Sequence, residues 1–386
     1  MLAYIFERFP KFSQTFCYRE VAELYRQGVR PPIFSLRAAD LGRERDWDPE
    51  ILAAVHTLPE GDAFAALADQ ARRSLSPDAE KILRDWRGRR DSLRLHQAAY
   101  IGVRLRELGV TRVHVHFAGM AARTAWWIEK FFGIPFSVTA HANDIFVPSE
   151  FEIGLLEIFG SARAIVTVSD FAAHYLRQKF PAARERTHRV YNGINLHEFD
   201  TERFDKPPLI LSIGRLIAKK GFDVLITACA QLRGLDFRCE IIGEGPLRQE
   251  LREQIDRLNL TNDVSLERGL TQKEIAARLS AATLFVLPCR IEKDGAMDNL
   301  PTVIMEAMAA SLPVISTDVG GISEMVVDRK TGFLVAQNDG IAVAGAMERL
   351  LRDNDLARRF GARGRERCME LFSLEKNVSD LRRILL

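Results

Sequence analysis

The sequence has few cysteines, little net charge and no long apolar run. Its five cysteines are scattered along 386 residues and never form a C-x-x-C pair, which is typical of reduced thiols in a cytosolic protein. The 54 basic residues nearly balance the 52 acidic ones, leaving a formal net charge of +2. Such a balance gives no support to a nucleic-acid-binding protein.

Segments for export or membrane insertion are also lacking. The first residues, MLAYIFERFPKF, reach a charge after six positions and offer no small-residue cleavage site, so we expect no signal peptide. No run approaches the roughly 20 apolar residues that a membrane-spanning helix requires. These absences predict a cytoplasmic protein and leave open a peripheral contact with the inner face of the membrane.

One basic stretch, KILRDWRGRRDSLRLHQ (81–97), bears on that contact. It is interpreted in two ways, and the favoured one is a solvated helical face. The alternative is a cationic surface for an anionic leaflet or a lipid-linked acceptor, with Trp86 as an interfacial anchor.

Short β-branched runs alternate with longer amphipathic runs in both halves of the chain. Strands are predicted at 112–117, 135–140, 163–169, 209–214, 237–243, 263–269, 283–288 and 312–317. This alternation predicts an α/β protein whose parallel sheets are covered by helices on both faces. We expect two doubly wound, Rossmann-like domains, with ligands at the carboxyl ends of the strands. The polar double-proline stretch FDTERFDKPP (199–208) is the predicted boundary.

The stretch SIGRLIAKKGFD (212–223) predicts an anion site after the first strand of the second half. Gly214 ends the strand, Arg215 and the pair 219–220 place cations beside the turn, and Gly221 opens the next helix. A helix start with nearby Arg and Lys favours phosphate. The alternative is that these lysines are merely solvated.

A second stretch, DNLPTVIMEAMA (298–309), points to the same chemistry. Pro301 suits the first helical position, and the free amides of 302–304 favour an anion. Glu306 shares a helix face with Thr302, and a carboxylate binds vicinal hydroxyls well. A diphosphate flanked by two carboxylates describes a nucleotide-sugar.

The alternative interpretation of the same stretch gives its two carboxylates structural roles only. Asp298 would be an ordinary helix cap and Glu306 a salt-bridge partner, and the spacing alone does not exclude this interpretation.

Seven segments occur in a fixed order along the chain. Together they resemble the retaining glycosyltransferases of family 4, which have the GT-B fold of two facing Rossmann-like domains. The resemblance spans most of the chain from about residue 110. The segments are VTAHANDIF (138–146), VSDFAAHYL (168–176), VYNGINLHEF (190–199), GRLIAKKG (214–221), IIGEGPLRQEL (241–251), LPTVIMEAMAASLPVIST (300–317) and GGISEMVVDRKTGFLV (320–335).

The resemblance implies roles for individual residues. Arg215 and Lys220 hold the phosphates, Glu306 the ribose and Asp298 the sugar, while His141 borders the reacting carbon. The implied donor-binding set is Gly214, Glu244, Leu270, Asn299, Leu300, Pro301 and Thr302.

The chain departs from the family pattern in three places. Asp298 stands where the first of two glutamates is usual, and Asn299 follows it in place of glycine. The glycine-rich loop after the first strand is absent, and KFSQTF (11–16) occupies its place. Asp variants and an N-terminus like RFPKFSQTF (8–16) resemble a branch associated with exopolysaccharide and lipopolysaccharide assembly.

Acceptor-side residues are expected in the first half. Ser13 and Thr15 would start a helix, and His116 and Asp144 would line the acceptor side. The motif HVH (114–116) puts two histidines on one strand face, but no third ligand accompanies them at useful spacing, so no metal site is predicted.

The sequence therefore predicts a retaining, metal-independent hexosyltransferase with no cofactor. Its partners would be a nucleotide-sugar donor and a glycan or lipid-linked acceptor, and no nucleic acid. The expected domains are 1–195 on the acceptor side, 206–365 for the donor, and a helix at 366–386 that returns to the first domain. The alternatives are a nucleotide-sugar epimerase on the same fold and a non-catalytic nucleotide-sugar-binding subunit.

Overall fold

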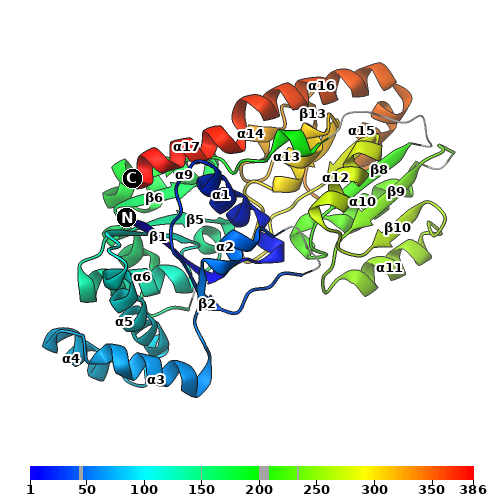
Figure 1. Ribbon diagram of the computed structural model, residues 1–386. Coiled ribbons are helices and arrows are strands. Elements are labelled where there is room, and N and C mark those ends of the chain that lie inside the picture. The colour runs from blue at the N-terminus through cyan, green and yellow to red at the C-terminus, as the bar shows by residue number, and fades with distance from the viewer. Residues whose placement is uncertain (43–46, 149, 200–207, 233) are drawn as a thin grey trace. The chain divides into compact units, whose positions relative to one another are not determined.

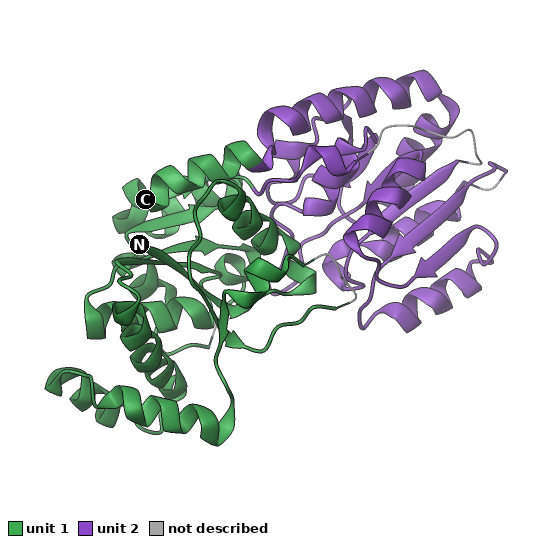
Figure 2. Cartoon of the chain, viewed as in Figure 1, with its two compact units in different colours: residues 1–191, 375–386 green, residues 192–374 purple. Residues whose placement is uncertain are grey.

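The computed structural model describes residues 1–42, 47–148, 150–199, 208–232 and 234–386 (Figure 1). The chain divides into two compact units, residues 1–191 with 375–386 and residues 192–374 (Figure 2). Most of the predicted boundary stretch, 200–207, lies outside the described residues. In the part of the chain that is described, no helix is long and apolar enough to cross a membrane.

The first unit contains a seven-stranded parallel sheet in the order β3-β2-β1-β4-β5-β6-β7. Its strands are β1 (Leu2–Arg8), β2 (Ile33–Arg37), β3 (Val55–Thr57), β4 (Arg112–His116), β5 (Phe136–Ala140), β6 (Ala164–Thr167) and β7 (Thr187–Arg189). The order reverses between β1 and β4. In doubly wound sheets such a reversal opens a crevice at the carboxyl ends of the two strands.

Helices connect these strands. They are α1 (Thr15–Arg26), α2 (Pro49–Ala53), α3 (Gly61–Arg72), α4 (Pro77–Asp85), α5 (Ser92–Glu107), α6 (Met120–Phe132), α7 (Ala142–Phe146), α8 (Leu155–Ser161) and α9 (Asp170–Lys179). A single 3₁₀ turn, η1 (Phe12–Gln14), leads into α1.

The second unit repeats the plan with six parallel strands in the order β10-β9-β8-β11-β12-β13. They are β8 (Leu209–Ile213), β9 (Arg238–Ile242), β10 (Val264–Glu267), β11 (Leu284–Leu287), β12 (Val314–Thr317) and β13 (Gly332–Val335). The helices are α10 (Phe222–Cys229), α11 (Arg248–Arg257), α12 (Gln272–Ala281), α13 (Thr302–Ala309), α14 (Ile322–Met325), α15 (Gly340–Arg352) and α16 (Asn354–Leu371). The predicted pair of doubly wound, Rossmann-like domains is confirmed.

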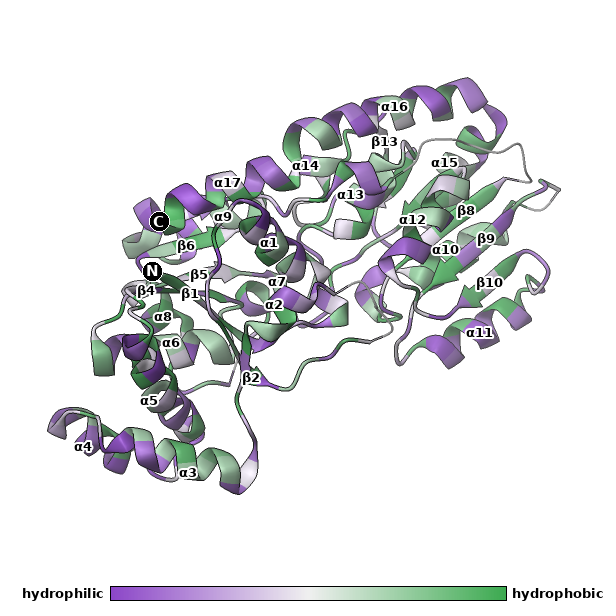
Figure 3. Ribbon diagram, viewed as in Figure 1, coloured by the Kyte–Doolittle hydropathy of each residue, from purple (hydrophilic) through white to green (hydrophobic). Residues whose placement is uncertain are grey.

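Central strands are buried on both faces, which explains why they contain continuous apolar runs. All four residues of β6 (AIVT) and of β11 (LFVL) are buried. Figure 3 shows the same contrast in hydropathy, with green central strands and purple turns on outer helices such as α11. The alternation read from the sequence therefore reflects burial.

The last helix, α17 (Leu374–Leu385), packs on the first unit. Gln27 of α1 donates to the Glu375 carbonyl (3.2 Å) and accepts from Arg382 (3.0 Å). Arg112 of β4 donates to the Leu385 carbonyl (3.0 Å). These contacts tie the end of the chain to the start of the sheet.

The expected returning segment, 366–386, is split in the structure. Residues up to Leu371 continue α16 in the second unit, and Phe372, which is fully buried, ends that helix. Ile194 N–H donates to the Phe372 carbonyl (2.9 Å), and Leu374 N–H donates to the Ile194 carbonyl (3.2 Å). Through this pairing, residues 192–195 belong to the second unit. The first unit therefore ends at Tyr191 and not at the predicted residue 195.

The loop between β8 and α10 depends on a glycine. Gly221 has a φ of +70°, and a Cβ there would lie 2.0 Å from the Pro288 carbonyl oxygen. Gly221→Ala should therefore lower the free energy of unfolding by about 2 kcal/mol or more, from left-handed strain and the clash. Urea unfolding measures the change.

Gly160→Ala is the matched control. Gly160 is exposed in α8, and a Cβ there meets nothing within 4 Å. Helix propensity should make that variant as stable as the wild type or up to ~1 kcal/mol more stable. Equal losses for the two variants would contradict the steric explanation.

Candidate functional site

In the second unit, a lysine pair and a carboxylate meet at the carboxyl ends of β8 and β11. Lys220 Nζ lies 2.7 Å from Asp298 Oδ2, and Lys219 Nζ lies 3.6 Å from Asp298 Oδ1. The three side chains are only 8–14% exposed. The structure thus brings together Lys220 and Asp298, two residues predicted from separate motifs, and adds Lys219.

Both members of the closest pair keep their charge despite burial. Burial raises the pKa of Asp298, but Lys220 and Lys219 outweigh it, and the net pKa lies below the usual 3.8. Burial lowers the pKa of Lys220, but Asp298 and Cys289 outweigh it, and the net pKa lies above 10.5. At neutral pH the site therefore holds fixed charges.

Cys289 contributes a thiol to this cluster. Its Sγ donates to Asp298 Oδ2 at 3.5 Å, and the side chain is fully buried. Burial, together with the Asp298 charge, raises the pKa of the thiol well above 9.0. Cys289 is therefore a neutral hydrogen-bond donor, and only its place just after β11 could have marked it in the residue pattern.

Glycines set the course of the loops around the cluster. Gly320 has a φ of +59°, and a Cβ there would lie 2.4 Å from the Asp298 carbonyl oxygen. Gly321 N–H donates to the Asn299 carbonyl (2.7 Å). A Cβ on Gly243 would lie 1.9 Å from the Gly214 carbonyl oxygen. The backbone segments that hold the cluster approach too closely to admit side chains at these positions.

The start of α13 differs by one residue from the prediction. Pro301 is the N-cap, with extended backbone (φ −63°, ψ 114°), and Thr302 is the first helical residue. Ile304 N–H donates to the Pro301 carbonyl (3.0 Å), so the expected set of free amides, 302–304, loses its last member. The amides of Thr302 and Val303 remain at the positive end of the helix.

The other predicted donor residues are spread over the same edge of the sheet. Glu306 is 2% exposed within α13, Asn299 and Leu300 are buried, and Arg215 is exposed. Glu244 accepts from Gly269 N–H (3.2 Å). Leu270 lines a cavity of about 410 Å³ together with Arg248, Leu266, Glu267, Arg268, Glu274 and Arg278.

In the first unit, Ser13 and Thr15 occupy the loop after β1. Ser13 is exposed in the 3₁₀ turn η1, and Thr15 is the first residue of α1. The N-cap of α1 is Gln14, and it makes no side-chain capping bond. Thr15 therefore starts the helix as predicted, whereas Ser13 lies in the 3₁₀ turn that precedes it.

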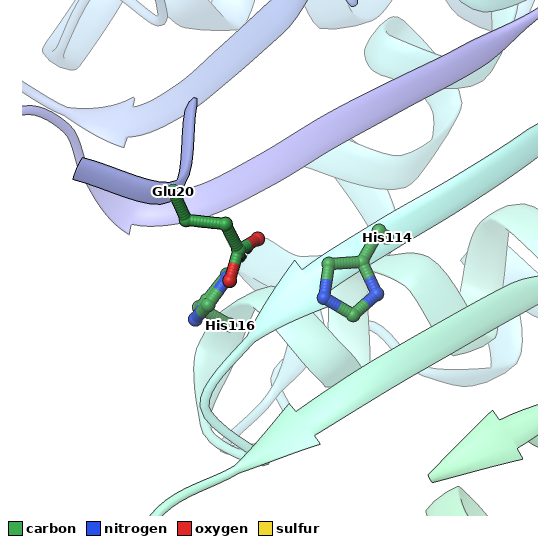
Figure 4. Close-up of side chains that lie close together, drawn as sticks. All are labelled: Glu20, His114 and His116. Carbon is green, nitrogen blue, oxygen red and sulfur yellow. Dashed lines mark hydrogen bonds and ion pairs between the residues drawn. The ribbon is translucent and has the colours of Figure 1, made fainter. Parts of the chain in front are cut away.

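A polar cluster joins α1, β4 and the residue after β5. Figure 4 shows its members from α1 and β4, Glu20 and His116, together with His114. His116 Nε2 lies 3.0 Å from Glu20 Oε1, and His116 Nδ1 lies 3.3 Å from His141 Nε2. Tyr4 donates to Glu20 Oε1 (2.8 Å). Both histidines were predicted as site residues, whereas Glu20 was missed, because nothing in the sequence around α1 marks it.

The two histidines of this cluster differ in charge. Burial lowers the pKa of His116, but Cys17 and Glu20 outweigh it, and the net pKa lies well above 6.5. Burial, and then the charge of His116, lower the pKa of His141 well below 6.5. His116 is therefore an imidazolium at neutral pH, and His141 is neutral.

Asp144 and Phe117 shape the surroundings of His141. Asp144 Oδ2 accepts from His141 N–H (3.0 Å) and Ala118 N–H (2.9 Å), and burial raises the pKa of this carboxyl to about 6. Phe117, which directly follows β4, has a φ of +69° and packs its ring 4.4 Å from that of His141. Strain of this kind in a non-glycine residue tends to occur at functional sites.

The metal hypothesis for HVH needs a correction. A third candidate ligand exists in space, because the donor atoms of Glu20, His114 and His116 all lie within 4.8 Å of one another. The fit for an ion is nevertheless poor. His114 Nδ1 is hydrogen-bonded to Ser137 Oγ (2.8 Å) and His114 Nε2 to Thr139 Oγ1 (3.0 Å), so both of its nitrogens are engaged.

Comparisons with family models cover both units. Residues 13–198 match the model described as Glycosyltransferase Family 4, and residues 194–367 match the one described as Glycosyl transferases group 1.

Three curated relatives illustrate the sequence similarity. Alpha-D-kanosaminyltransferase of Streptomyces kanamyceticus is 30% identical over 66% of this chain and 71% of its own. The amylovoran biosynthesis glycosyltransferase AmsK of Erwinia amylovora is 29% identical over 90% of each chain. The putative colanic acid biosynthesis glycosyltransferase WcaL of Escherichia coli (strain K12) is 37% identical over 49% of this chain. The match spans about half of the length of WcaL, 47%.

Solved structures show the same fold. Sucrose-phosphate synthase from Thermosynechococcus elongatus aligns with a TM-score of 0.77 at 22% identity, covering 100% of this chain and 98% of the other. Anabaena HepE in complex with UDP and glucose aligns with a TM-score of 0.73 at 17% identity, covering 100% and 99%.

The buried pair of Asp298 and Lys220 predicts a loss of stability in acid. The pKa of Asp298 is lower in the folded state than the ordinary value of about 3.9 in the unfolded chain. The contribution of Asp298 to the free energy of unfolding is therefore full above that pH, and it is lost as the pH falls through the folded-state pKa. At pH 7 the free energy of unfolding of the wild type should exceed that of Asp298→Asn by about 3 kcal/mol. This difference should shrink below pH 4.

Urea unfolding at a series of pH values measures this difference. Asp223→Asn is the control, because Asp223 pairs with Arg290 (2.8 Å) while 40% exposed. Asp223→Asn should lower the free energy of unfolding by less than about 1 kcal/mol. A difference for Asp298→Asn that does not change between pH 7 and pH 3 would contradict the assignment of a buried, charged carboxylate.

Proposed function

The chain belongs to the family 4 glycosyltransferases of the GT-B fold, and we propose that it is a retaining, metal-independent hexosyltransferase. The donor in this proposal is a UDP- or GDP-sugar, and the acceptor is a glycan or lipid-linked sugar in cell-surface polysaccharide biosynthesis. The observation that carries the proposal is the cluster of Lys219, Lys220 and Asp298. Its carboxylate lies four residues before the start of α13.

The chemistry of the cluster suits a departing diphosphate. When the glycosidic bond breaks, about two negative charges must be stabilised on the leaving group, and positioned cations and amides do this best in a dry site. An ammonium has three N–H donors, so Lys220 keeps donors for phosphate while bound to Asp298. Thr302 and Val303 add amides at the positive end of α13.

Arg215 adds an exposed cation to this fixed set. It is exposed and lies two residues after the end of β8. Its guanidinium can therefore reorient to bind a phosphate of the donor. Glu306 supplies the carboxylate for the ribose hydroxyls, and its burial at 2% exposure strengthens hydrogen bonds to it.

Names of related proteins support the donor and acceptor classes. HepE is described in complex with UDP-glucose. A relative in Mycobacterium tuberculosis is named a GDP-mannose-dependent mannosyltransferase of a phosphatidylinositol monomannoside. AmsK is named for amylovoran biosynthesis. Both nucleotides, and both glycan and lipid-linked acceptors, therefore belong in a substrate screen.

The basic stretch 81–97 makes its contacts within the first unit. Arg90 pairs with Glu150 (2.9 Å), and Arg89 lies 3.9 Å from Glu152. The Trp86 ring packs against that of Trp127, with centroids 4.9 Å apart. These contacts engage two of the cations and the proposed anchor, Trp86, within the first unit, which favours the solvated-face interpretation.

Lys220→Ala tests the role of the fixed cation. Removing a positioned donor from a transition state costs roughly 3–4 kcal/mol, so turnover should fall by ~100-fold or more. Steady-state rates with the best UDP- or GDP-sugar measure this, alongside circular dichroism to show a folded variant. Lys330→Ala, at an exposed position in the same unit, should leave the rate unchanged. Matching rates for both variants would refute the role.

Chelation tests the absence of a metal requirement. Because protein cations supply the compensating charge, turnover of the wild type should be the same with and without excess EDTA. The assay uses the purified enzyme, its donor and its acceptor at neutral pH. If EDTA abolished turnover and Mg²⁺ or Mn²⁺ restored it, the cation-based mechanism would be wrong.

A further inference from the structure

We propose that Arg94, Arg37 and the start of α6 form an anion site at the carboxyl edge of the first sheet, and that this site holds a phosphate group of the acceptor. The site itself is built from contacts within the first unit alone. Its assignment to the acceptor deepens the proposed function and rests on it, because a sugar transferase binds a second substrate besides its donor.

Arg94 is a buried cation without a partner. It is 9% exposed and lies in the first turn of α5. Among the residues that the structure describes, its side chain makes no hydrogen bond or ion pair, and only its backbone N–H donates, to the Asp91 carbonyl (2.8 Å). Arg90, in the same basic stretch, is instead 60% exposed and pairs with Glu150 (2.9 Å). Because an uncompensated buried charge is costly, the position of Arg94 points to a ligand that supplies the missing negative charge.

The packing of α5 against α6 places Arg94 beside the start of α6. The two helices lie side by side and run in the same direction, since one precedes β4 and the other follows it (Figure 1). Gly102 lies against Phe132, the last residue of α6, and a Cβ on this glycine would approach the ring to 2.1 Å. About two turns earlier in both helices, Arg94 comes level with the beginning of α6. Long side chains on a helix lean toward its N-terminus, so the guanidinium is directed to the carboxyl edge.

Arg37 contacts the same helix start from the end of β2. Its Nη2 lies 3.7 Å from the Sδ of Met120, the first residue of α6. The N-cap, Gly119, has no side chain, and the first backbone bond of the helix runs from Arg123 N–H to the Gly119 carbonyl (3.3 Å). The amides of 120–122 therefore have no partner within the helix. They lie at the positive end of a helix of 13 residues, where an anion is favoured.

The charges around Arg94 suit a phosphate. In the described part of the chain, the charged groups that face it are Arg37, Asp91 and Glu7. Burial, and then the charge of Arg37, lower the pKa of Arg94, while the two carboxylates raise it by less. Asp91 Oδ2 already accepts from Glu152 N–H (2.9 Å), and Glu7 Oε1 lies 3.6 Å from an Nη1 of the other arginine. A guanidinium presents its N–H groups as a fork that fits a phosphate bidentately.

The nearest competing explanation is a structural cation that Asp91 and Glu7 hold at a distance. In that case replacing Arg94 would lower the melting temperature, Tm. An unpaired cation costs stability instead, so Arg94→Met, which keeps a long unbranched side chain, should leave the Tm unchanged or raise it. Arg104→Met is the matched control, because Arg104 lies in the last turn of α5, is 42% exposed and pairs with Glu107.

Titration calorimetry with inorganic pyrophosphate tests the site directly. The full chain carries Lys220→Ala in every sample, which weakens the phosphate cluster of the second unit and leaves the first unit unchanged. Adding Arg94→Met should weaken the Kd about tenfold or more, and adding Arg104→Met should change it less than about twofold. Arg94→Lys keeps the charge but loses the fork, so its Kd should lie between these values.

Two results of these measurements would overturn the anion site. The first is an equal Kd for pyrophosphate in the samples with Arg94→Met and Arg104→Met. The second is a lower Tm for Arg94→Met than for the wild type without pyrophosphate, because Arg94 would then have a structural partner.

Two further probes distinguish the source of the phosphate. Farnesyl diphosphate carries a diphosphate on an isoprenoid chain, and glucose 1-phosphate carries a phosphate on a soluble sugar. The probe whose Kd weakens about tenfold with Arg94→Met identifies the acceptor as a lipid-linked diphosphate or as a phosphorylated sugar. A dependence of both shows that the phosphate group alone is recognised. If neither Kd changes with Arg94→Met, the assignment to the acceptor is wrong.

Transfer kinetics separate this site from the donor site. With the acceptor class that the probes identify, Arg94→Met should raise the KM for the acceptor about tenfold and leave the KM for the donor within about twofold. An unchanged KM for the acceptor would contradict the assignment. If no UDP- or GDP-sugar is turned over, the proposed function fails, and the titrations with pyrophosphate still decide whether Arg94 binds an anion.

Discussion

Each unit depends on a carboxylate buried beside a cation at the carboxyl edge of its sheet. Burial alone would neutralise such groups, because desolvation penalises their charged forms. In the second unit the lysines keep Asp298 ionised, and Asp298 keeps Lys220 protonated. In the first unit Glu20, 3.0 Å from His116, raises the pKa of that imidazole against the effect of burial. The charges at both edges are therefore set by the fold before a ligand is bound, and this is what electrostatic stabilisation of a leaving group requires.

Close backbone approaches place these charges. The backbone at Gly243 lies so close to the Gly214 carbonyl that a Cβ on Gly243 would clash with it. The backbone at Gly320 is equally close to the Asp298 carbonyl. Leu216 N–H donates to the Glu244 carbonyl (2.8 Å), so the crossing is also hydrogen-bonded. Loops held in this way have little freedom. A rigid loop positions a cation without paying for its ordering when the substrate binds.

The sequence was enough to predict the two doubly wound domains, because burial of parallel strands leaves apolar runs at regular spacing. It also assigned Lys220 and Asp298 to one site, because each lies just before a predicted helix at the carboxyl edge of the sheet and both fall on motifs of the resembled family. Glu20 escaped prediction because its contact with His116 spans 96 positions and depends on the pairing of β1 with β4. The start of α13 was misplaced by one residue because the backbone bond from Ile304 to Pro301 cannot be seen in a residue pattern.

The replacement of the usual glutamate by Asp298 has a physical consequence. Its two oxygens are engaged separately, Oδ1 by Lys219 and Oδ2 by Lys220 and Cys289. A hydroxyl of a donor sugar must compete with these partners or share them. Two lysines against one carboxylate leave a net positive charge at the cluster, and Arg215 adds another. Under the proposed function, the diphosphate of the donor would neutralise that excess and so weaken the hold of the two lysines on Asp298.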